Sequence, residues 1–298
     1  MTFRFSVNPR WSDLPHCSAL LHGFPRDYSV SDYRTTLSIK TVVRGEAWYE
    51  TPQGRYRVTP DTFLVLNEGQ QYSMEVDAQC KTETFCPFFQ PGFVQAGEFC
   101  ERLYPMRGRV GTVIRSMLAI PLEDAFYDLA EALVGLRDDT RRESVTFPGL
   151  RASTREEMYR RLYRARDFLY SCYAEPLSVA DAAGVAALSP FHFQRMFKSA
   201  FGISPMQFLQ RRRLDVARQL LAGTEEDVTA ICAAVGFESL GSFSSLFKRR
   251  FGVPPSKTRH PPSSTLNRLF APRARRNDAD RAARFVLDVA DVVLRRRR

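Results

Sequence analysis

The chain has 298 residues, which is long enough for two ordinary domains with cores of their own and excludes a minidomain stapled by disulfides. Its formal net charge of +10 is unevenly distributed, because residues 1–150 carry 16 Lys and Arg against 19 Asp and Glu, whereas residues 151–298 carry 27 against 14. The second half, at +13, is therefore the part suited to an acidic partner such as nucleic acid.

The six cysteines are scattered, with no C-x-x-C pair and no histidine at ligand spacing. We therefore expect reduced thiols, no metal site and no cofactor. No run approaches the roughly 18 apolar residues that cross a bilayer, and the N-terminus lacks the apolar core of an export signal. The sequence predicts a soluble, cytoplasmic protein with no membrane partner.

Residues 34–94 show short apolar alternations separated by turn residues. Leu37, Ile39, Thr41 and Val43 alternate with polar neighbours, and further short runs follow up to the turn at 67–69. Strands of this length and spacing favour a β-sandwich or a small barrel over a βαβ sheet.

The period becomes helical between residues 121 and 137. Leu122, Phe126, Leu129 and Leu133 recur on one stripe. This stripe is either a dimer seam or the face that packs against the barrel, and the sequence leaves both open. The charged stretch 138–154, broken by Pro-Gly, is typical of an interdomain linker.

The helical part that follows contains the same unit twice. Residues 189–205 match residues 239–255 at a constant offset of 50. In the first copy, Ser178 begins a short helix, Ser189 caps a second helix, and Gly202 ends it. Two helices joined by a tight turn form a helix-turn-helix, whose second helix enters the major groove of DNA.

The polar face of each second helix supplies the candidate DNA-binding residues. A polar face opposite an apolar one is usually only solvated, but two such faces in a half carrying +13 favour DNA contact. The candidates are Ser189, His192, Gln194, Arg195 and Lys198 in the first copy, and Ser239, Leu240, Gly241, Ser242, Ser244, Ser245, Lys248 and Arg249 in the second. Arg pairs with guanine and Gln with adenine, whereas Ser and Lys more often contact phosphate, so we expect the second copy to read less sequence.

A connecting helix of about 17 residues separates the two copies and spans roughly 25 Å. With its flanking helices, this spacing would place the reading helices about 34 Å apart, one turn of DNA. Of its three consecutive arginines, 211–213, we expect some to touch phosphate and at least one to form an ion pair.

Residues 178–259 resemble the DNA-binding domain of the AraC/XylS family of bacterial transcription regulators. The resemblance rests on S-P-F-H-F-Q-R-M-F-K (189–198), R-R-L-D-V-A-R-Q-L-L (212–221) and G-F-E-S-L-G-S-F-S-S-L-F-K-R-R-F-G-V-P-P (236–255). One departure is Ala187, where members commonly have glycine, as this chain has at Gly236. If that turn needs a positive φ, alanine costs about 1 kcal/mol there.

The resemblance implies an α+β fold of two domains. A cupin-like β-barrel with trailing helices, residues 1–137, would bind an effector and dimerise, and the AraC-type domain, 155–259, would follow the linker 138–154. Residues 260–298 lie outside the resemblance, and their composition favours a basic, disordered tail. Aromatic residues are the candidate pocket lining: Trp48, Tyr56, Tyr72 and Phe88. None of the four histidines lies in the strand region, so we expect no metal in the barrel.

The predicted function is a sequence-specific DNA-binding transcription regulator, an activator controlled by a small molecule. Its partners would be double-stranded DNA, RNA polymerase, the effector and a second copy of the chain. The alternatives are a non-specific, architectural DNA binder that uses the arginine tail, an effector-independent regulator, and an enzyme addressed to DNA. The chain has no nucleophile motif, metal triad or Gly-rich phosphate loop, so we predict no enzyme.

Overall fold

The computed structural model describes residues 3–7, 18–24, 28–76, 81–95, 97–119, 124–147 and 152–258, and these belong to one compact unit. The predicted tail at 260–298 lies outside the described residues. The strands are β1 (Phe3–Val7), β2 (Ser18–Gly23), β3 (Tyr28–Arg34), β4 (Ser38–Arg44), β5 (Ala47–Thr51), β6 (Gly54–Val58), β7 (Thr62–Leu66), β8 (Gln71–Val76), β9 (Glu83–Phe88) and β10 (Leu103–Pro105). The helices are α1 (Gly108–Ala119), α2 (Asp124–Val145), α3 (Ala152–Ser171), α4 (Val179–Val185), α5 (Pro190–Phe201), α6 (Pro205–Gly223), α7 (Val228–Ala234) and α8 (Leu240–Phe251).

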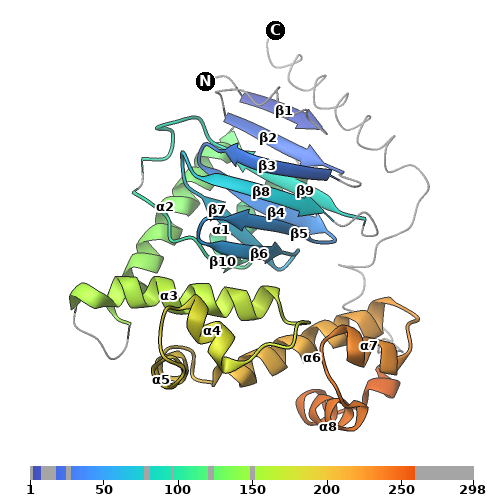
Figure 1. Ribbon diagram of the computed structural model, residues 1–298. Coiled ribbons are helices and arrows are strands. Elements are labelled where there is room, and N and C mark those ends of the chain that lie inside the picture. Colours follow the sequence, from blue (N-terminus) through green and yellow to red (C-terminus); the bar gives the residue numbers. More distant parts are fainter. Residues whose placement is uncertain are drawn as a thin grey trace. The chain divides into compact units, whose positions relative to one another are not determined.

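The strands form two sheets (Figure 1). The larger sheet has the order β1-β2-β9-β4-β7-β10 and the smaller one β3-β8-β5-β6. All pairs are antiparallel except β1 with β2. Among the described strands no ladder joins the two sheets, so the predicted barrel is not closed, and the arrangement is a sandwich.

Apolar side chains from both sheets fill the space between them. This cluster includes Val42 and Leu64 of the larger sheet and Tyr49 and Tyr72 of the smaller one. The opposite face of the larger sheet is covered by α1 and α2, where Ile39 and Phe63 meet residues of both helices. The central strand β4 is therefore covered on both faces, which its alternating sequence did not predict.

The helix expected at 121–137 is α2, and its apolar stripe packs into the sheet. Phe126, Leu129 and Leu133 are each 0% exposed in the cluster beneath the larger sheet. Leu122 lies outside the described residues. These three side chains are buried within the chain, so they are not available to contact a second subunit. Of the two alternatives, dimer seam or packing face, the structure shows the packing face.

The linker predicted at 138–154 is wrong over most of its length. Helix α2 continues to Val145 and α3 begins at Ala152. The charged residues of this stretch form helical pairs, as between Arg142 and Asp139, while Thr140 is buried. High charge in this segment reflects a two-sided helix rather than a flexible connection.

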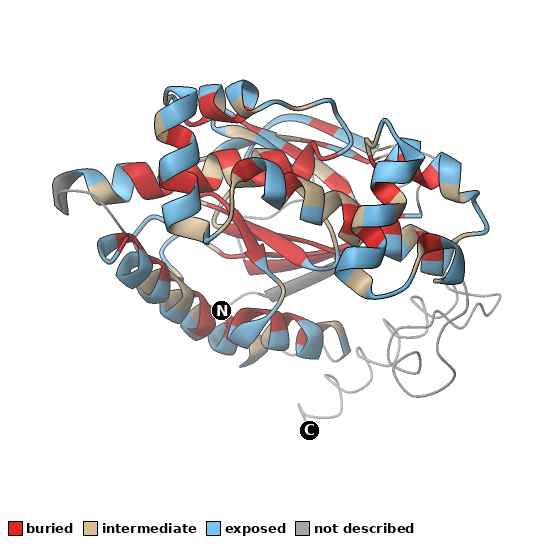
Figure 2. Cartoon of the chain, turned by 90° about the horizontal axis from the view of Figure 1, so that it is seen from below, coloured by how far each residue is buried: buried red, intermediate tan, exposed pale blue. Residues whose placement is uncertain are grey.

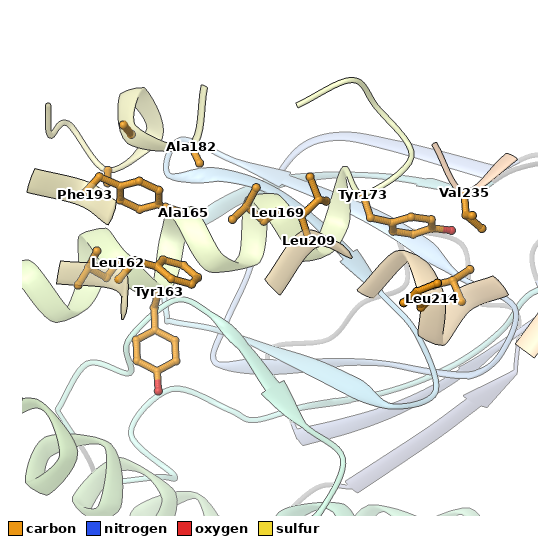
Figure 3. Close-up of a cluster of buried hydrophobic side chains, with 14 of the residues drawn as sticks. Leu162, Tyr163, Ala165, Leu169, Tyr173, Ala182, Phe193, Leu209, Leu214 and Val235 are labelled. Carbon is orange, nitrogen blue, oxygen red and sulfur yellow. The ribbon is translucent and has the colours of Figure 1, made fainter. Parts of the chain in front are cut away.

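The helical half packs around α3. Leu162 and Leu169 on this helix meet Phe193 of α5 and Leu209 of α6 in one buried cluster, which also reaches Val235 next to α7 (Figure 3). Each surrounding helix turns a buried stripe inward and leaves the opposite side exposed (Figure 2). The outward sides of α5 and α8 are thus free to face another molecule.

Candidate nucleic-acid interface

The first repeated unit consists of α4 and α5. Ser178 and Asp181 form the expected capping box at the start of α4, and the Ser189 hydroxyl accepts the backbone N–H of His192 at the start of α5. Gly202 ends α5 in the left-handed conformation, with φ of 74°. These predicted starts and stops are confirmed, and they define a helix-turn-helix.

The turn of this unit contains Ala187 at φ of 50°, and the equivalent Gly236 of the second unit lies at φ of 84°. The position therefore does require a positive φ, as the comparison of the two copies suggested. At Gly236 glycine is also a steric necessity, because a Cβ there would lie 2.6 Å from the carbonyl oxygen of Ala174. Ala187, which is exposed, is the strained member of the pair.

Helix α5 buries one face and exposes the other. Phe193, Met196 and Phe197 enter the core, whereas Gln194, Arg195 and Lys198 are exposed and His192 is half-buried. Within the described residues the structure gives the side chains of Gln194, Arg195 and Lys198 no hydrogen bond or ion pair. Ser189 is exposed and acts as the helix cap.

The second unit, α7 and α8, repeats this geometry. Asp227 caps α7 by accepting the N–H of Thr229 at 2.7 Å, and the Ser239 hydroxyl caps α8 by accepting the N–H of Ser242. Phe243 and Phe247 are buried. The outward side of α8 carries small and basic residues, all exposed except the half-buried Ser244: Leu240, Gly241, Ser242, Ser244, Ser245, Lys248 and Arg249.

One residue of this surface was missed by the sequence analysis. Phe191, the second residue of α5, is 78% exposed, more than any other large apolar side chain in the described part of the chain. The sequence did indicate that Phe191 is exposed, because the residue lies outside the apolar stripe of 193, 196 and 197. It also follows the capping Ser189 and Pro190, which places it in the first turn of α5. A large apolar side chain held in water at the leading turn of a reading helix is suited to contact thymine methyl groups.

The three arginines of α6 have separate roles. Arg211 is exposed, whereas Arg212 lies over the Tyr170 ring at 3.7 Å and Arg213 donates to the carbonyl oxygens of Tyr173 and Glu175 at 2.7 Å. The ion pair expected of at least one of them is thus replaced by bonds to backbone carbonyls. Arg211 alone keeps an exposed side chain for phosphate.

The aromatic candidates of the N-terminal half lie in its core. Tyr56, Tyr72 and Phe88 are at most 5% exposed, and Trp48 is half-buried with the Arg55 guanidinium 4.3 Å from its ring. Their role as an effector-pocket lining stays a prediction.

A lysine that the sequence analysis passed over lies among these rings. Lys40 on β4 is 1% exposed, and its Nζ donates to the Tyr72 hydroxyl at 3.1 Å and lies 4.0 Å from the centroid of Phe88. Among the described residues it has no ion pair with a carboxylate. Burial lowers the pKa of Lys40 to about 7, and the neighbouring Cys86 acts weakly in the opposite direction.

The described residues hold neither a cluster of metal-ligating side chains nor a membrane-spanning helix. They contain no group of three or more His, Cys, Asp and Glu side chains arranged to hold a metal ion. No helix among them has the length and apolarity needed to cross a membrane.

The helical half of the chain is similar to known proteins. The helix-turn-helix domain family matches residues 182–260. A probable transcriptional regulator, LumQ of Photobacterium leiognathi, is 40% identical over 81 residues, covering 27% of this chain and 33% of LumQ. Residues 182–260 form an AraC-family helix-turn-helix domain.

Two further AraC-type proteins share this domain. The transcriptional activator RhaS of Enterobacter is 36% identical over 106 residues, which cover 36% of this chain and 38% of RhaS. A crystal structure of a transcriptional regulator with an AraC-type DNA-binding domain, from Chromobacterium violaceum, is 33% identical over 33% of this chain and 88% of that one, with a TM-score of 0.32. The chain thus spans between a third and two-fifths of the length of LumQ and RhaS.

Proposed function

We propose that this protein is a sequence-specific DNA-binding transcription regulator. The observation that carries the proposal is the pair of exposed helix faces on α5 and α8, presented by two capped and closely similar helix-turn-helix units. The basic side chains of these faces, Arg195, Lys198, Lys248 and Arg249, have no hydrogen bond or ion pair among the described residues, so they are available to phosphates and base edges.

The two helices would divide the work. Gln194 and Arg195 on α5 have the bidentate chemistry that reads adenine and guanine. The outward side of α8 has Ser242, Ser245 and Lys248, whose side chains suit phosphate oxygens better. We therefore propose that α5 supplies most of the sequence discrimination and α8 most of the non-specific affinity.

We further propose that the sandwich domain controls the AraC-family domain in response to a small molecule, and that the protein activates transcription through RNA polymerase as a homodimer. Support for activation is that RhaS, a relative of the helical domain, is named a transcriptional activator. The physical link is α3, which packs against β6 of the sandwich and against α4 and α6 of the AraC-family domain. A change in the sandwich would reach the reading helices through this helix.

Two substitutions test the division of work on a site selected from genomic fragments. Arg195→Ala should lower discrimination at one base position by about 1–3 kcal/mol, because it removes a bidentate base contact. Lys248→Ala should weaken binding to all sequences alike and make the salt dependence shallower. Fluorescence anisotropy titrations at several salt concentrations measure both effects.

The competing function is an architectural DNA binder. It predicts weak binding without sequence preference at every salt concentration, and equal losses from both variants on all sequences. Circular dichroism of each variant serves as the folding control, since both side chains are exposed. Unfolding of either variant would show that these residues were wrongly assigned to the outward face.

A further inference from the structure

A polar cleft lies between α2, α3 and the segment that follows β9. Its volume is about 260 Å³, and Glu98, Arg137, Arg141, Glu156 and Arg160 are among the residues that line it. Pockets for drug-sized ligands are typically roughly 300–1,000 Å³, so the cleft suits a small metabolite. It is separate from both the reading helices and the core between the sheets.

The charges of the cleft are only partly paired. Arg160 forms an ion pair with Glu156 at 2.7 Å, and Arg137 forms one with Asp138 at 2.8 Å. Within the described part of the chain, the Arg141 guanidinium and the Glu98 carboxylate have no ion pair, either with each other or with a third group. The cleft therefore presents one unpaired positive group and one unpaired negative group.

This pairing pattern selects the charge of an occupant. A simple anion would be attracted by Arg141 but repelled by the carboxylates of Glu98 and Glu156. A simple cation would be attracted by Glu98 but repelled by the three guanidiniums of the cleft. A molecule with one group of each sign satisfies both. Arginine binds carboxylate through two parallel N–H donors, and a carboxylate accepts from an ammonium.

We propose that this cleft binds a small zwitterion of the amino-acid class, with the ligand carboxylate on Arg141 and its ammonium on Glu98. Gly97 also lines the cleft, and a Cβ there would stand 3.7 Å from the Arg137 guanidinium, an ordinary contact distance. Tyr159 also lines the cleft, and its side chain is 1% exposed.

The cleft also lies where a ligand could act on the AraC-family domain. At the cleft, the Tyr159 hydroxyl of α3 donates to Glu143 of α2 at 2.7 Å, and Glu143 pairs with the buried Arg102 at 3.4 Å. Arg102 in turn lies 4.1 Å from the centroid of Tyr163 on α3. A ligand bound to Arg141 would therefore act on α2 and, through the contacts of Glu143, on α3, the helix around which the AraC-family domain packs. This consequence for DNA rests on the proposed function; the binding itself does not.

The binding test uses the full chain and needs no DNA. The common L-amino acids are screened at millimolar concentration by thermal denaturation, and calorimetry gives the Kd of those that stabilise. For each of these, the N-acetyl derivative lacks the ammonium and the amide lacks the carboxylate. We expect the zwitterion to raise Tm and both derivatives to lose at least tenfold in affinity. The absence of a shift with every amino acid would overturn the proposal, as would equal binding of either derivative.

Variants locate the site. Arg141→Ala and Glu98→Gln should each weaken the amino acid at least tenfold. Arg142→Ala is the matched control, because it is the next residue on the same helix, pairs with Asp139 and does not line the cleft. Equal losses in Arg141→Ala and Arg142→Ala would place the ligand elsewhere and overturn the assignment.

The two proposals fail separately. DNA binding by the ligand-free protein tests the regulator function, and amino-acid binding without DNA tests the cleft. If both hold, the amino acid should change the affinity for DNA, and Arg141→Ala should abolish that change while leaving ligand-free DNA binding intact. A ligand effect on DNA that persists in Arg141→Ala would contradict control through this cleft.

Discussion

Phe191 occupies a position where an apolar side chain gains nothing from the fold. Its side chain is 78% exposed, so the domain should not lose stability when it is replaced. A contact with a thymine methyl in the major groove would explain the residue, since burying one methyl contributes about 0.8 kcal/mol.

We therefore predict that replacing one thymine of the selected site by deoxyuridine weakens the wild-type protein by about 1 kcal/mol. Phe191→Ala should bind the thymine and uracil sites equally, because the partner of the methyl is gone. Arg195→Ala is the control and should keep the preference. Anisotropy titrations with the two duplexes measure the difference, and an undiminished preference for thymine in Phe191→Ala would contradict the contact.

The burial of Lys40 makes the stability of the protein depend on pH. The pKa of its ammonium is about 7 in the folded chain and 10.5 as the ordinary value, so between these pH values the unfolded state binds more protons. Stability must then rise with pH across this window. The groups facing Lys40 are the Tyr72 hydroxyl and the Cys86 thiol. Burial raises the pKa of the Cys86 thiol, so this group is less readily ionised than an exposed thiol.

The prediction is a wild-type free energy of unfolding that increases by up to about 1.4 kcal/mol per pH unit between pH 7.5 and 9.5, relative to Lys40→Met. The variant should also be the more stable protein at pH 6.5, because an unpaired buried charge is removed. Urea unfolding at each pH measures this. Lys81→Met, at an exposed position, should match the wild type. A difference between wild type and Lys40→Met that stays constant with pH would exclude a lowered pKa at Lys40.

At the scale of the element, the turn decides how each helix-turn-helix unit closes. Both turns hold a residue in the left-handed region, but one has alanine and the other glycine. The two sites differ in what surrounds them: Ala187 is exposed, whereas a Cβ at Gly236 would lie 2.6 Å from the carbonyl oxygen of Ala174. Ala187→Gly and Gly236→Ala should therefore change the free energy of unfolding by different amounts and with opposite signs.

Ala187→Gly should stabilise the protein by about 0.5–1 kcal/mol, the relief of left-handed strain less the greater entropy of glycine in the unfolded chain. Gly236→Ala should destabilise it by about 2 kcal/mol or more, because strain and a steric clash add. Urea unfolding monitored by circular dichroism compares the pair. A Gly236→Ala protein as stable as the wild type would show that the turn can open.

At the scale of the whole molecule, α3 connects the sandwich to the AraC-family domain through buried polar bonds. The Asp167 carboxylate, 1% exposed, accepts the backbone N–H of Leu103 in β10 at 2.7 Å. Arg166 donates to the carbonyl oxygen of Leu103 at 2.8 Å. The Ser171 hydroxyl of α3 accepts the backbone N–H of Arg57 in β6 at 3.0 Å. These bonds tie the edges of both sheets to one helix.

Asp167→Ala should lower the free energy of unfolding by about 2–3 kcal/mol, since it leaves a buried N–H of β10 without an acceptor. Asp167→Asn, which keeps an acceptor, should lose less. Asp139→Ala, at an exposed pair, should cost about 0.5 kcal/mol or less. Trp48 fluorescence and helical circular dichroism follow the two halves; their transitions should separate in Asp167→Ala, and coincident transitions with unchanged stability would show that Asp167 does not couple them.

Sequence alone determined the local features of this protein. The caps at Ser178 and Ser189, the stop at Gly202 and the need for positive φ at Ala187 depend on residues only a few positions apart, so a repeated sequence was enough to predict them.

The tertiary structure alone decided which faces are covered. Lys40 alternates with apolar neighbours as a solvent-facing residue would, yet it is buried because the second sheet covers its side of β4. The stripe containing Phe126 was equally suited to a partner subunit, and it packs, together with α1, on the face of the larger sheet that the smaller sheet does not cover. Burial depends on segments distant in the chain, and periodicity within one segment shows only that a face is apolar, not which partner covers it.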